Sequence, residues 1–179
     1  MSVPITHVQL VARAVTHLRT TRRCPVVLSE MQCNWIESPD AIGFSKKHST
    51  LIECKVSRSD FGRDARKASR RPSVGMGYYR YYLVPAGVVR SHEVNGFNPE
   101  IQFTEGWGLL WYHPISHRIT QEKPSMRFDV NRQAENLFLV SALQRVQLRL
   151  MTPLHEYIRW QQGPDERPIS VGPVALESL

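Results

Sequence analysis

Two short apolar segments joined by a polar turn constrain the fold of this 179-residue chain more than any other feature. The segments are residues 41–44 and 51–56, and residues 45–50 between them are polar. This pattern predicts a β-hairpin. Because side chains alternate between the two faces of a strand, every second residue from Ile52 to Val56 is expected to face the core.

The other face of the second strand carries charge. Glu53 and Lys55 share that face with Leu51, which predicts a polar cleft at the edge of the core. Asp40, directly before the first strand, is expected roughly opposite the far end of the second. Asp40 and Glu53 could bind Mg²⁺ or Mn²⁺, with the backbone carbonyl of Cys54 as a further ligand. Such a cation activates water for phosphodiester hydrolysis, and Lys55 could position that water or stabilise developing charge. The alternative is an exposed strand with an ordinary ion pair.

These residues resemble a known signature. Pro39-Asp40 followed by Glu53-Cys54-Lys55 resembles the motif of the PD-(D/E)xK nuclease superfamily. Residues 26–30 resemble its first core strand, and residues 55–61 resemble the K-x-S-x-x-D-F run of the MmcB-like DNA repair proteins. Residues 81–85 and 108–112 resemble the next two strands of that group. The resemblance covers residues 8–112, and the chain departs from it between residues 85 and 108 and after residue 114.

The resemblance implies an α/β fold with a restriction-endonuclease-like core. Its elements follow the order α-β-β-β-α-β, and a mixed central sheet is flanked by helices. It also implies a metal-dependent endonuclease acting on DNA, in which Glu30 is an auxiliary metal ligand or catalytic group beside Asp40, Glu53 and Lys55. The alternative is a catalytically silent protein that keeps the nuclease fold and binds nucleic acid or regulates a partner.

The net charge of +7 indicates a polyanionic partner. Basic residues at 63, 66, 67 and 70 have helical spacing, which predicts a basic stripe on a helix over residues 59–70. Aromatic residues before the next strand could stack on bases. The predicted nucleic-acid contacts are Arg58, Arg63, Arg66, Lys67, Arg70, Arg71 and Tyr78. The alternative is that the basic residues form a solvated helix face and the tyrosines pack in the core.

The remaining pattern predicts a helix over residues 6–22, a long loop with room for a short helix over 86–106, and a long helix over 131–151. We expect a nuclease-like core in residues 1–123, a helical extension in 124–162 and a flexible tail in 163–179. The C-terminal helices either pack on the open face of the sheet or form a homodimer surface.

Cysteine content and hydropathy narrow the protein class. The three cysteines are odd in number and irregularly spaced, which argues against a disulfide framework. The sequence has no segment long and apolar enough to span a bilayer and no signal-peptide pattern, so we expect a cytoplasmic protein without a membrane partner. His113 and His117 are four residues apart, but Pro114 disfavours a helix there. Surface histidines are therefore favoured over a zinc site.

Overall fold

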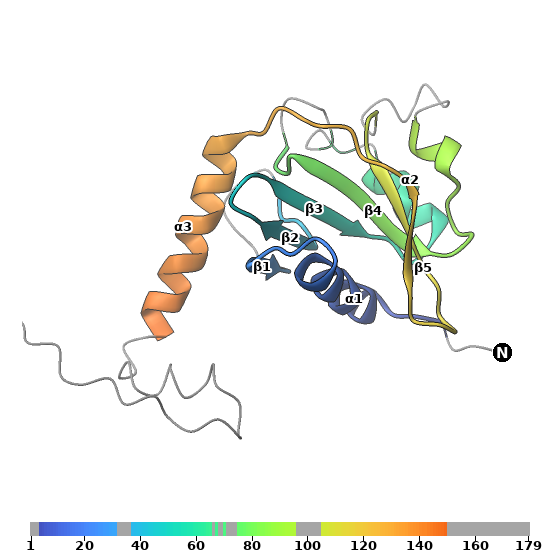
Figure 1. Ribbon diagram of the computed structural model, residues 1–179, viewed down its shortest axis with the longest axis horizontal. Coiled ribbons are helices and arrows are strands. Elements are labelled where there is room, and N and C mark those ends of the chain that lie inside the picture. Colours follow the sequence, from blue (N-terminus) through green and yellow to red (C-terminus); the bar gives the residue numbers. More distant parts are fainter. Residues whose placement is uncertain are drawn as a thin grey trace, which may run out of the picture. The chain divides into compact units, whose positions relative to one another are not determined.

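A six-stranded mixed sheet forms the centre of the structure, with helices on both faces (Figure 1). The computed structural model describes residues 4–31, 37–65, 67, 70, 75–95 and 105–149. The elements are α1 His7–Thr20, β1 Val26–Ser29, β2 Ala41–Phe44, β3 Ser49–Cys54, α2 Arg58–Asp64, β4 Tyr79–Pro85, the 3₁₀ helix η2 Ser91–Asn95, β5 Gly108–Tyr112, β6 Ile119–Lys123 and α3 Arg132–Arg149.

The strands lie in the sheet in the order of the sequence, β1-β2-β3-β4-β5-β6. The first three form an antiparallel meander, β3, β4 and β5 are parallel, and β6 is antiparallel to β5. The α/β fold class and the order α-β-β-β-α-β are therefore confirmed. The predicted hairpin is also confirmed, since Ala41 of β2 lies opposite Ile52 of β3.

Each face of the sheet has its own apolar core. On one face, Leu10, Ala14 and Leu18 of α1 pack against a group of strand residues that includes Ile52 and Cys54. These apolar residues recur every three or four positions, so they lie on one face of α1. At the start of the helix, Thr6 and Gln9 form a capping box. This face therefore agrees with the predicted orientation of Ile52 and Cys54.

The opposite face is also covered, which the sequence did not indicate. Leu51 packs there with Phe61 of α2 and Tyr82 of β4, and Trp107 stacks on Tyr82 at a ring-centroid distance of 4.6 Å. Glu53 and Lys55 are consequently only 2% and 6% exposed. The prediction of a polar cleft on this face is wrong, because α2 and Trp107 bury it.

The helix after Lys55 is shorter than predicted. Ser57 caps it by accepting a hydrogen bond from the N–H of Asp60, but α2 ends at Asp64. Arg70 lies beyond the helix and is 2% exposed, so the predicted basic stripe over residues 59–70 is wrong. The physical reason is that the guanidinium of Arg70 ion-pairs with buried carboxylates instead of facing solvent.

The remaining differences lie in the second half of the chain. Residues 119–123 form the edge strand β6, whose side chains are largely exposed and so give no apolar signal. The predicted loop does contain a short helix, η2 over residues 91–95, and residues 96–104 lie outside the described part of the chain. Residues from 150 onward, which include the end of the predicted helical extension and the predicted tail, also lie outside it.

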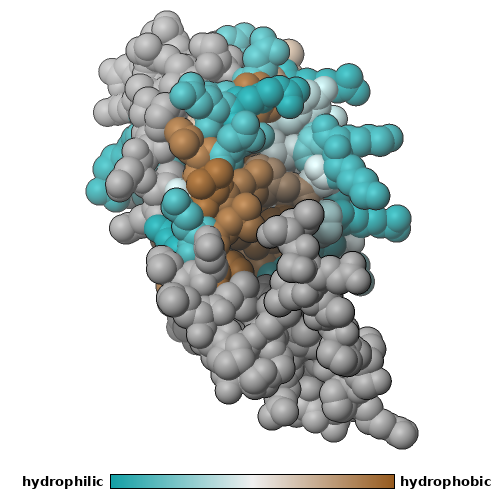
Figure 2. Space-filling model, turned by 90° about the vertical axis from the view of Figure 1, so that its left-hand side faces the viewer, coloured by the Kyte–Doolittle hydropathy of each residue, from teal (hydrophilic) through white to brown (hydrophobic). Residues whose placement is uncertain are grey.

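The long C-terminal helix is confirmed as α3. The chain divides into two compact units, Met1–Ser141 and Ala142–Leu179, and the boundary falls inside this helix. Within the first unit, Ala134 and Phe138 join the core, whereas Leu137 and Val140 are 42% and 49% exposed. Figure 2 shows apolar side chains gathered on the face of the molecule that lies at the left of Figure 1. The early turns of α3 thus pack on the sheet domain, and the homodimer stays a prediction.

Among the described residues, no helix is both long and apolar enough to cross a membrane.

Candidate functional site

Asp40 lies beside the end of β3, next to the rest of the signature. Asp40 precedes β2, and its Oδ2 atom accepts a hydrogen bond from the backbone N–H of Cys54 at 2.7 Å. This contact fixes Asp40 beside the end of β3. The antiparallel register brings the two strand ends together, because Ala41 pairs with Ile52. The hairpin therefore assembles the site, as its sequence predicted.

Lys55 lies at the centre of a group of carboxylates. Its Nζ atom is 3.2 Å from Glu53 Oε2, 3.3 Å from Asp64 Oδ1 and 3.5 Å from Asp40 Oδ2. Burial tends to lower the pKa of this lysine, but the charges of Glu53, Asp64 and Asp40 outweigh burial and raise it above its usual value. Lys55 is therefore a fixed positive charge at the site.

Glu53 is the most deeply buried of the three charged signature residues. Burial raises its pKa to about 8, with Arg70 opposing the rise and Asp40 adding to it. One of its oxygens, Oε2, binds both Lys55 and Arg70. The other, Oε1, is buried and has no hydrogen-bond partner in the described part of the chain. An unpaired buried carboxylate oxygen is costly, and this one is available to water or to a ligand.

Two residues that the sequence did not single out complete the buried group. Asp64, the last residue of α2, binds Arg70 through both oxygens at 2.7 and 2.9 Å and accepts a hydrogen bond from the Tyr82 hydroxyl at 3.1 Å. Glu37 binds the Nη1 atom of Arg70 at 2.6 Å and accepts the backbone N–H of Met76. The sequence did contain a signal for Asp64. It lies three residues after Phe61, so the two residues share one face of α2, and the apolar Phe61 indicates that this face points inward.

Carboxyl groups outnumber the cations at the centre of this group. Four of them, from Glu37, Asp40, Glu53 and Asp64, lie around Lys55 and Arg70. Lys67, which is 59% exposed, adds positive charge 2.7 Å from Asp64, and Arg80 adds positive charge near Glu37. These oxygen ligands suit a hard divalent cation once Glu53 has lost its proton. Asp40, whose side chain is 17% exposed, marks the side on which the group meets solvent.

Glu30 also lies on this solvent side, and its side chain is 50% exposed. Its N–H donates to the carbonyl of Asp40 at 3.1 Å, and its φ of 49° places it in the left-handed region. Such a conformation in a non-glycine residue is strained, and strain often accompanies function. His7, the first residue of α1, bridges the two, with Nε2 3.4 Å from Asp40 Oδ2 and Nδ1 4.0 Å from Glu30 Oε1.

The signature provides two carboxylate ligands for a metal ion, which is fewer than a full set of protein ligands. In the described residues, no group of three or more histidine, cysteine, aspartate or glutamate side chains is placed to hold a metal. Asp40 and the free oxygen of Glu53 nevertheless fit Mg²⁺, which keeps several waters and takes one or two carboxylates. His113 and His117 instead bind Thr120 and Tyr112.

The predicted nucleic-acid contacts separate into distinct places. Arg63 is 80% exposed, Lys67 borders the buried group, and Arg58, although 69% exposed, pairs with Glu93. Arg70 is buried and cannot contact a phosphate directly from its present position. Arg66 and Arg71 lie outside the described residues.

Tyr78 lies at the opposite end of β4 from the carboxylates. Its neighbour Tyr79 pairs with Thr50 of β3, whereas the carboxylates lie near the pair formed by Cys54 and Leu83. These two pairs are four residues apart along each strand, which corresponds to about 13 Å. The structure therefore does not bring Tyr78 to the signature residues.

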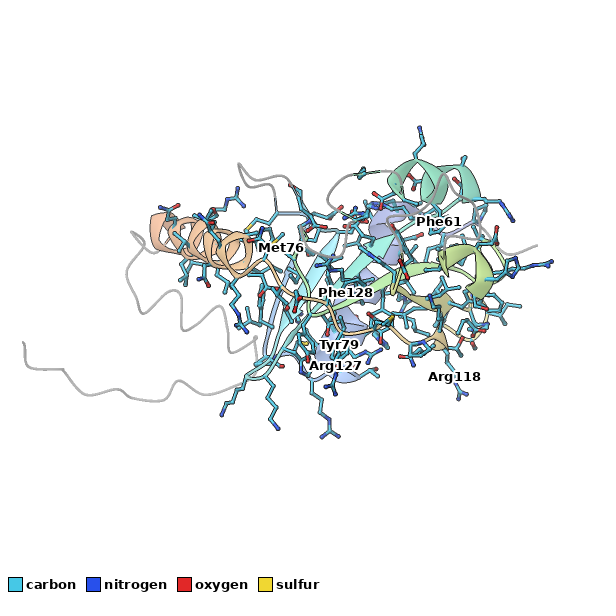
Figure 3. The ribbon with its side chains drawn as sticks, turned by 90° about the horizontal axis from the view of Figure 1, so that it is seen from above. Phe61, Met76, Tyr79, Arg118, Arg127 and Phe128 are labelled. Atoms are coloured by element: carbon cyan, nitrogen blue, oxygen red, sulfur yellow. The ribbon has the colours of Figure 1, made fainter. Side chains whose placement is uncertain are left out.

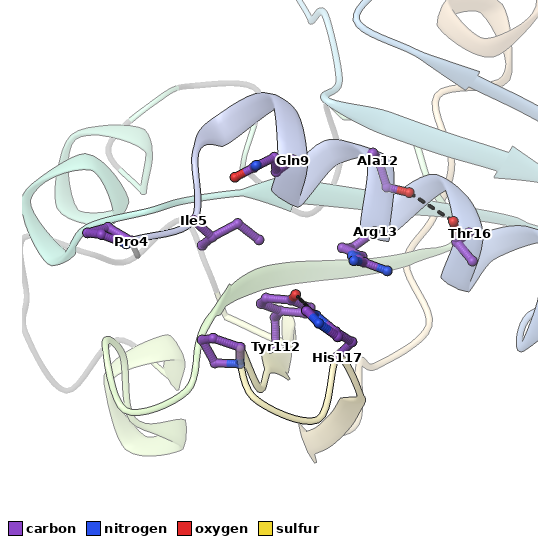
Figure 4. A pocket seen from close by; sticks show the side chains of 9 residues that line it. Pro4, Ile5, Gln9, Ala12, Arg13, Thr16, Tyr112 and His117 are labelled. Atoms are coloured by element: carbon purple, nitrogen blue, oxygen red, sulfur yellow. Dashed lines mark hydrogen bonds between the residues drawn. The ribbon is translucent and has the colours of Figure 1, made fainter. Parts of the chain in front are cut away.

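A shallow groove of about 460 Å³ runs between α1 and the turn after β5 (Figure 4). Ile5, Arg13, Tyr112 and His117 are among its lining residues, and none of the signature residues lines it. Its position gives it no part in the carboxylate chemistry.

Comparisons with known proteins bear on the fold. No family model matches the chain, and no curated protein matches it. Among solved structures, the chain is similar to the SPO1766 protein of unknown function from Silicibacter pomeroyi, with 21% identity and a TM-score of 0.53. The similarity covers 83% of this chain and 94% of that one, and it shows the fold alone.

Proposed function

We propose that this protein is a metal-dependent nuclease that hydrolyses phosphodiester bonds of DNA. The observation that carries the proposal is the unpaired Oε1 atom of Glu53, a buried carboxylate oxygen beside Lys55. A solvent-accessible Asp40 on the other side of Lys55 supplies the second carboxylate. A buried polar atom that lacks a protein partner is expected to bind an ion or water.

Each residue has a defined part in this proposal. Asp40 and Glu53 hold Mg²⁺ or Mn²⁺, with the Cys54 carbonyl as a further oxygen ligand, and the ion supplies Lewis-acid activation of water and phosphate. Lys55 stays protonated and stabilises negative charge that develops on the phosphate. Asp64 and Arg70 hold Lys55 and Glu53 in place. Glu30 and His7 border the open side, where water enters.

One observation favours a second candidate, a catalytically silent nucleic-acid-binding protein. Arg70 Nη2 lies 2.9 Å from Glu53 Oε2 and neutralises part of the charge that a metal needs. A protein in which Arg70 takes the place of the ion would keep the fold and the exposed basic residues without turnover.

A substrate panel separates the two candidates. Purified full-length protein is incubated with plasmid, single-stranded and branched DNA in Mg²⁺, Mn²⁺ or EDTA. The proposal predicts a product that EDTA abolishes and Mg²⁺ restores. Binding of DNA without any EDTA-sensitive product on every substrate would instead support the silent protein.

A further inference from the structure

We infer that an aromatic and basic surface at the far end of the β3–β4 pair binds single-stranded nucleic acid. The surface consists of His48, Tyr78 and Tyr79 with Lys46, Lys47 and Arg127. This inference rests on the proposed function, since it names the strand form that the nuclease would take as substrate.

Three segments that are distant in sequence meet at this surface. His48 ends the turn between β2 and β3, Tyr78 directly precedes β4, and Tyr79 is the first residue of β4. The backbone N–H of Phe128 donates to the carbonyl of Tyr78 at 3.0 Å, which holds Arg127 beside the tyrosines. Figure 3 shows Arg127 and Tyr79 next to each other, while Arg118 lies apart from both.

The three rings hold one another in fixed orientations. Tyr79 packs edge-to-face against His48 at 5.1 Å and against Tyr78 at 5.0 Å between ring centroids. His48 and Tyr78 are 6.2 Å apart with an interplanar angle of 31°. All three side chains are partly exposed. Rings that are already ordered and accessible lose little conformational entropy when a base stacks on them.

Basic residues accompany these rings. Lys46 and Lys47 directly precede His48 in the chain, and both lysines and Arg127 are exposed. A side-chain hydrogen bond with Tyr79 raises the pKa of Arg127, so this arginine is a fixed positive charge beside the ring. Aromatic rings combined with basic side chains are the combination by which proteins bind single strands, because every base has a π face and every nucleotide a phosphate. A protein partner is less suited to this surface, because the centre of a protein interface is usually apolar and contains few charged residues.

The position of the surface suits a substrate that also reaches the carboxylates. The two places are separated by about 13 Å along β3 and β4, which is roughly four nucleotide steps at the spacing of a stacked strand. Bases held at the rings would therefore extend the substrate contact beyond the scissile phosphate. A double helix cannot offer its base faces in this way, so the rings favour unpaired strands.

The test measures binding without catalysis. The Asp40→Asn variant in EDTA is titrated into a fluorescent oligothymidylate of about 16 nucleotides, near the upper end of known single-strand site sizes, and into a duplex of equal length. We expect tighter binding of the single strand. We also expect Tyr78→Ala to weaken it about tenfold, with Tyr78→Phe close to the parent. Arg127→Gln should reduce the slope of log affinity against log salt by about one, whereas the matched control Arg118→Gln should weaken binding less.

Two results would overturn the inference. One is equal affinity for the single strand and the duplex together with no effect of Tyr78→Ala. The other is an Arg127→Gln variant that binds like Arg118→Gln. Either result leaves the cleavage assay untouched, because that assay uses the wild-type protein with metal. Conversely, loss of the nuclease proposal leaves this binding measurement fully informative, since it needs no turnover.

Discussion

The Nη2 atom of Arg70 lies 2.9 Å from Glu53 Oε2, and both side chains are 2% exposed. The same guanidinium also binds Asp64 and Glu37. Arg70 thus compensates three buried carboxylates that come from three separate parts of the chain. Its backbone carbonyl accepts a hydrogen bond from Trp107, and its guanidinium lies 5.4 Å from the centre of the Trp107 ring.

We predict that Arg70→Met lowers the free energy of unfolding by about 3–5 kcal/mol, because it leaves buried charges uncompensated. Urea unfolding monitored by circular dichroism measures the loss. Arg118→Met, an exposed substitution, is the control and should change stability by less than about 0.5 kcal/mol. Equal stability of the two variants would mean that Arg70 does not hold the carboxylate group together.

The acid stability of the protein should depend on Asp64. Burial opposes its ionisation, but hydrogen bonds and charge from Arg70 and Lys55 lower its pKa well below the ordinary 3.8. A carboxyl with a lowered folded pKa contributes stability above its unfolded pKa and loses it as pH falls further. We therefore expect wild-type stability to fall below about pH 4 and Asp64→Asn to show a shallower fall. Urea midpoints between pH 5 and pH 3 test this, and parallel curves for the two proteins would contradict it.

Cation binding should strengthen with pH because of Glu53. Burial raises its pKa to about 8, so its proton must leave before the carboxylate can bind a metal. Below pH 8 we expect Mn²⁺ affinity to rise about tenfold per pH unit and to level off above it. Calorimetric titrations in buffers of different ionisation enthalpy should also detect proton release. A flat affinity from pH 6 to pH 8 would show that Glu53 is already ionised or takes no part.

Lys55 should matter for cleavage more than for binding. Lys55→Met removes the charge at a similar side-chain length, and we expect the cleavage rate to fall by about 100-fold or more. Affinity for single-stranded DNA in EDTA should stay close to that of the wild type, since Lys55 is buried and about 13 Å from the aromatic surface. Lys46→Met, at an exposed lysine, should weaken the binding of single-stranded DNA and leave the cleavage rate at saturating DNA close to that of the wild type. A Lys55→Met variant with full activity would exclude the assigned role.

The sequence predicted the parts of the fold that local patterns encode. Alternation in residues 51–56 placed Ile52 and Cys54 in the core, and the helical period of residues 6–22 identified α1. The same alternation could not reveal that Leu51 faces a second core, because that core depends on distant residues such as Trp107 and Phe138. The edge strand β6 escaped prediction because its side chains are exposed and polar.

The candidate site was predictable only where its residues are close in sequence. The hairpin connected Asp40 with Glu53 and Lys55, and their proximity is confirmed. Arg70 was expected on a solvent-facing stripe because helical spacing alone cannot detect a buried counter-charge. Glu37 and Asp64 were not singled out, since their role arises from ion pairs with Arg70 across the fold. His48 joins Tyr78 only through the pairing of β3 with β4.

The most direct test of the nuclease proposal compares wild-type protein with Asp40→Asn on the same DNA. Asparagine keeps the shape of the side chain and an oxygen that can accept the Cys54 N–H, but it removes the negative charge. Asp129→Asn, at an exposed carboxylate, is the matched control. We predict that wild type and Asp129→Asn cleave in Mg²⁺ and stop in EDTA, whereas Asp40→Asn yields no product. Undiminished, EDTA-sensitive cleavage by a clean Asp40→Asn preparation would contradict the proposed site.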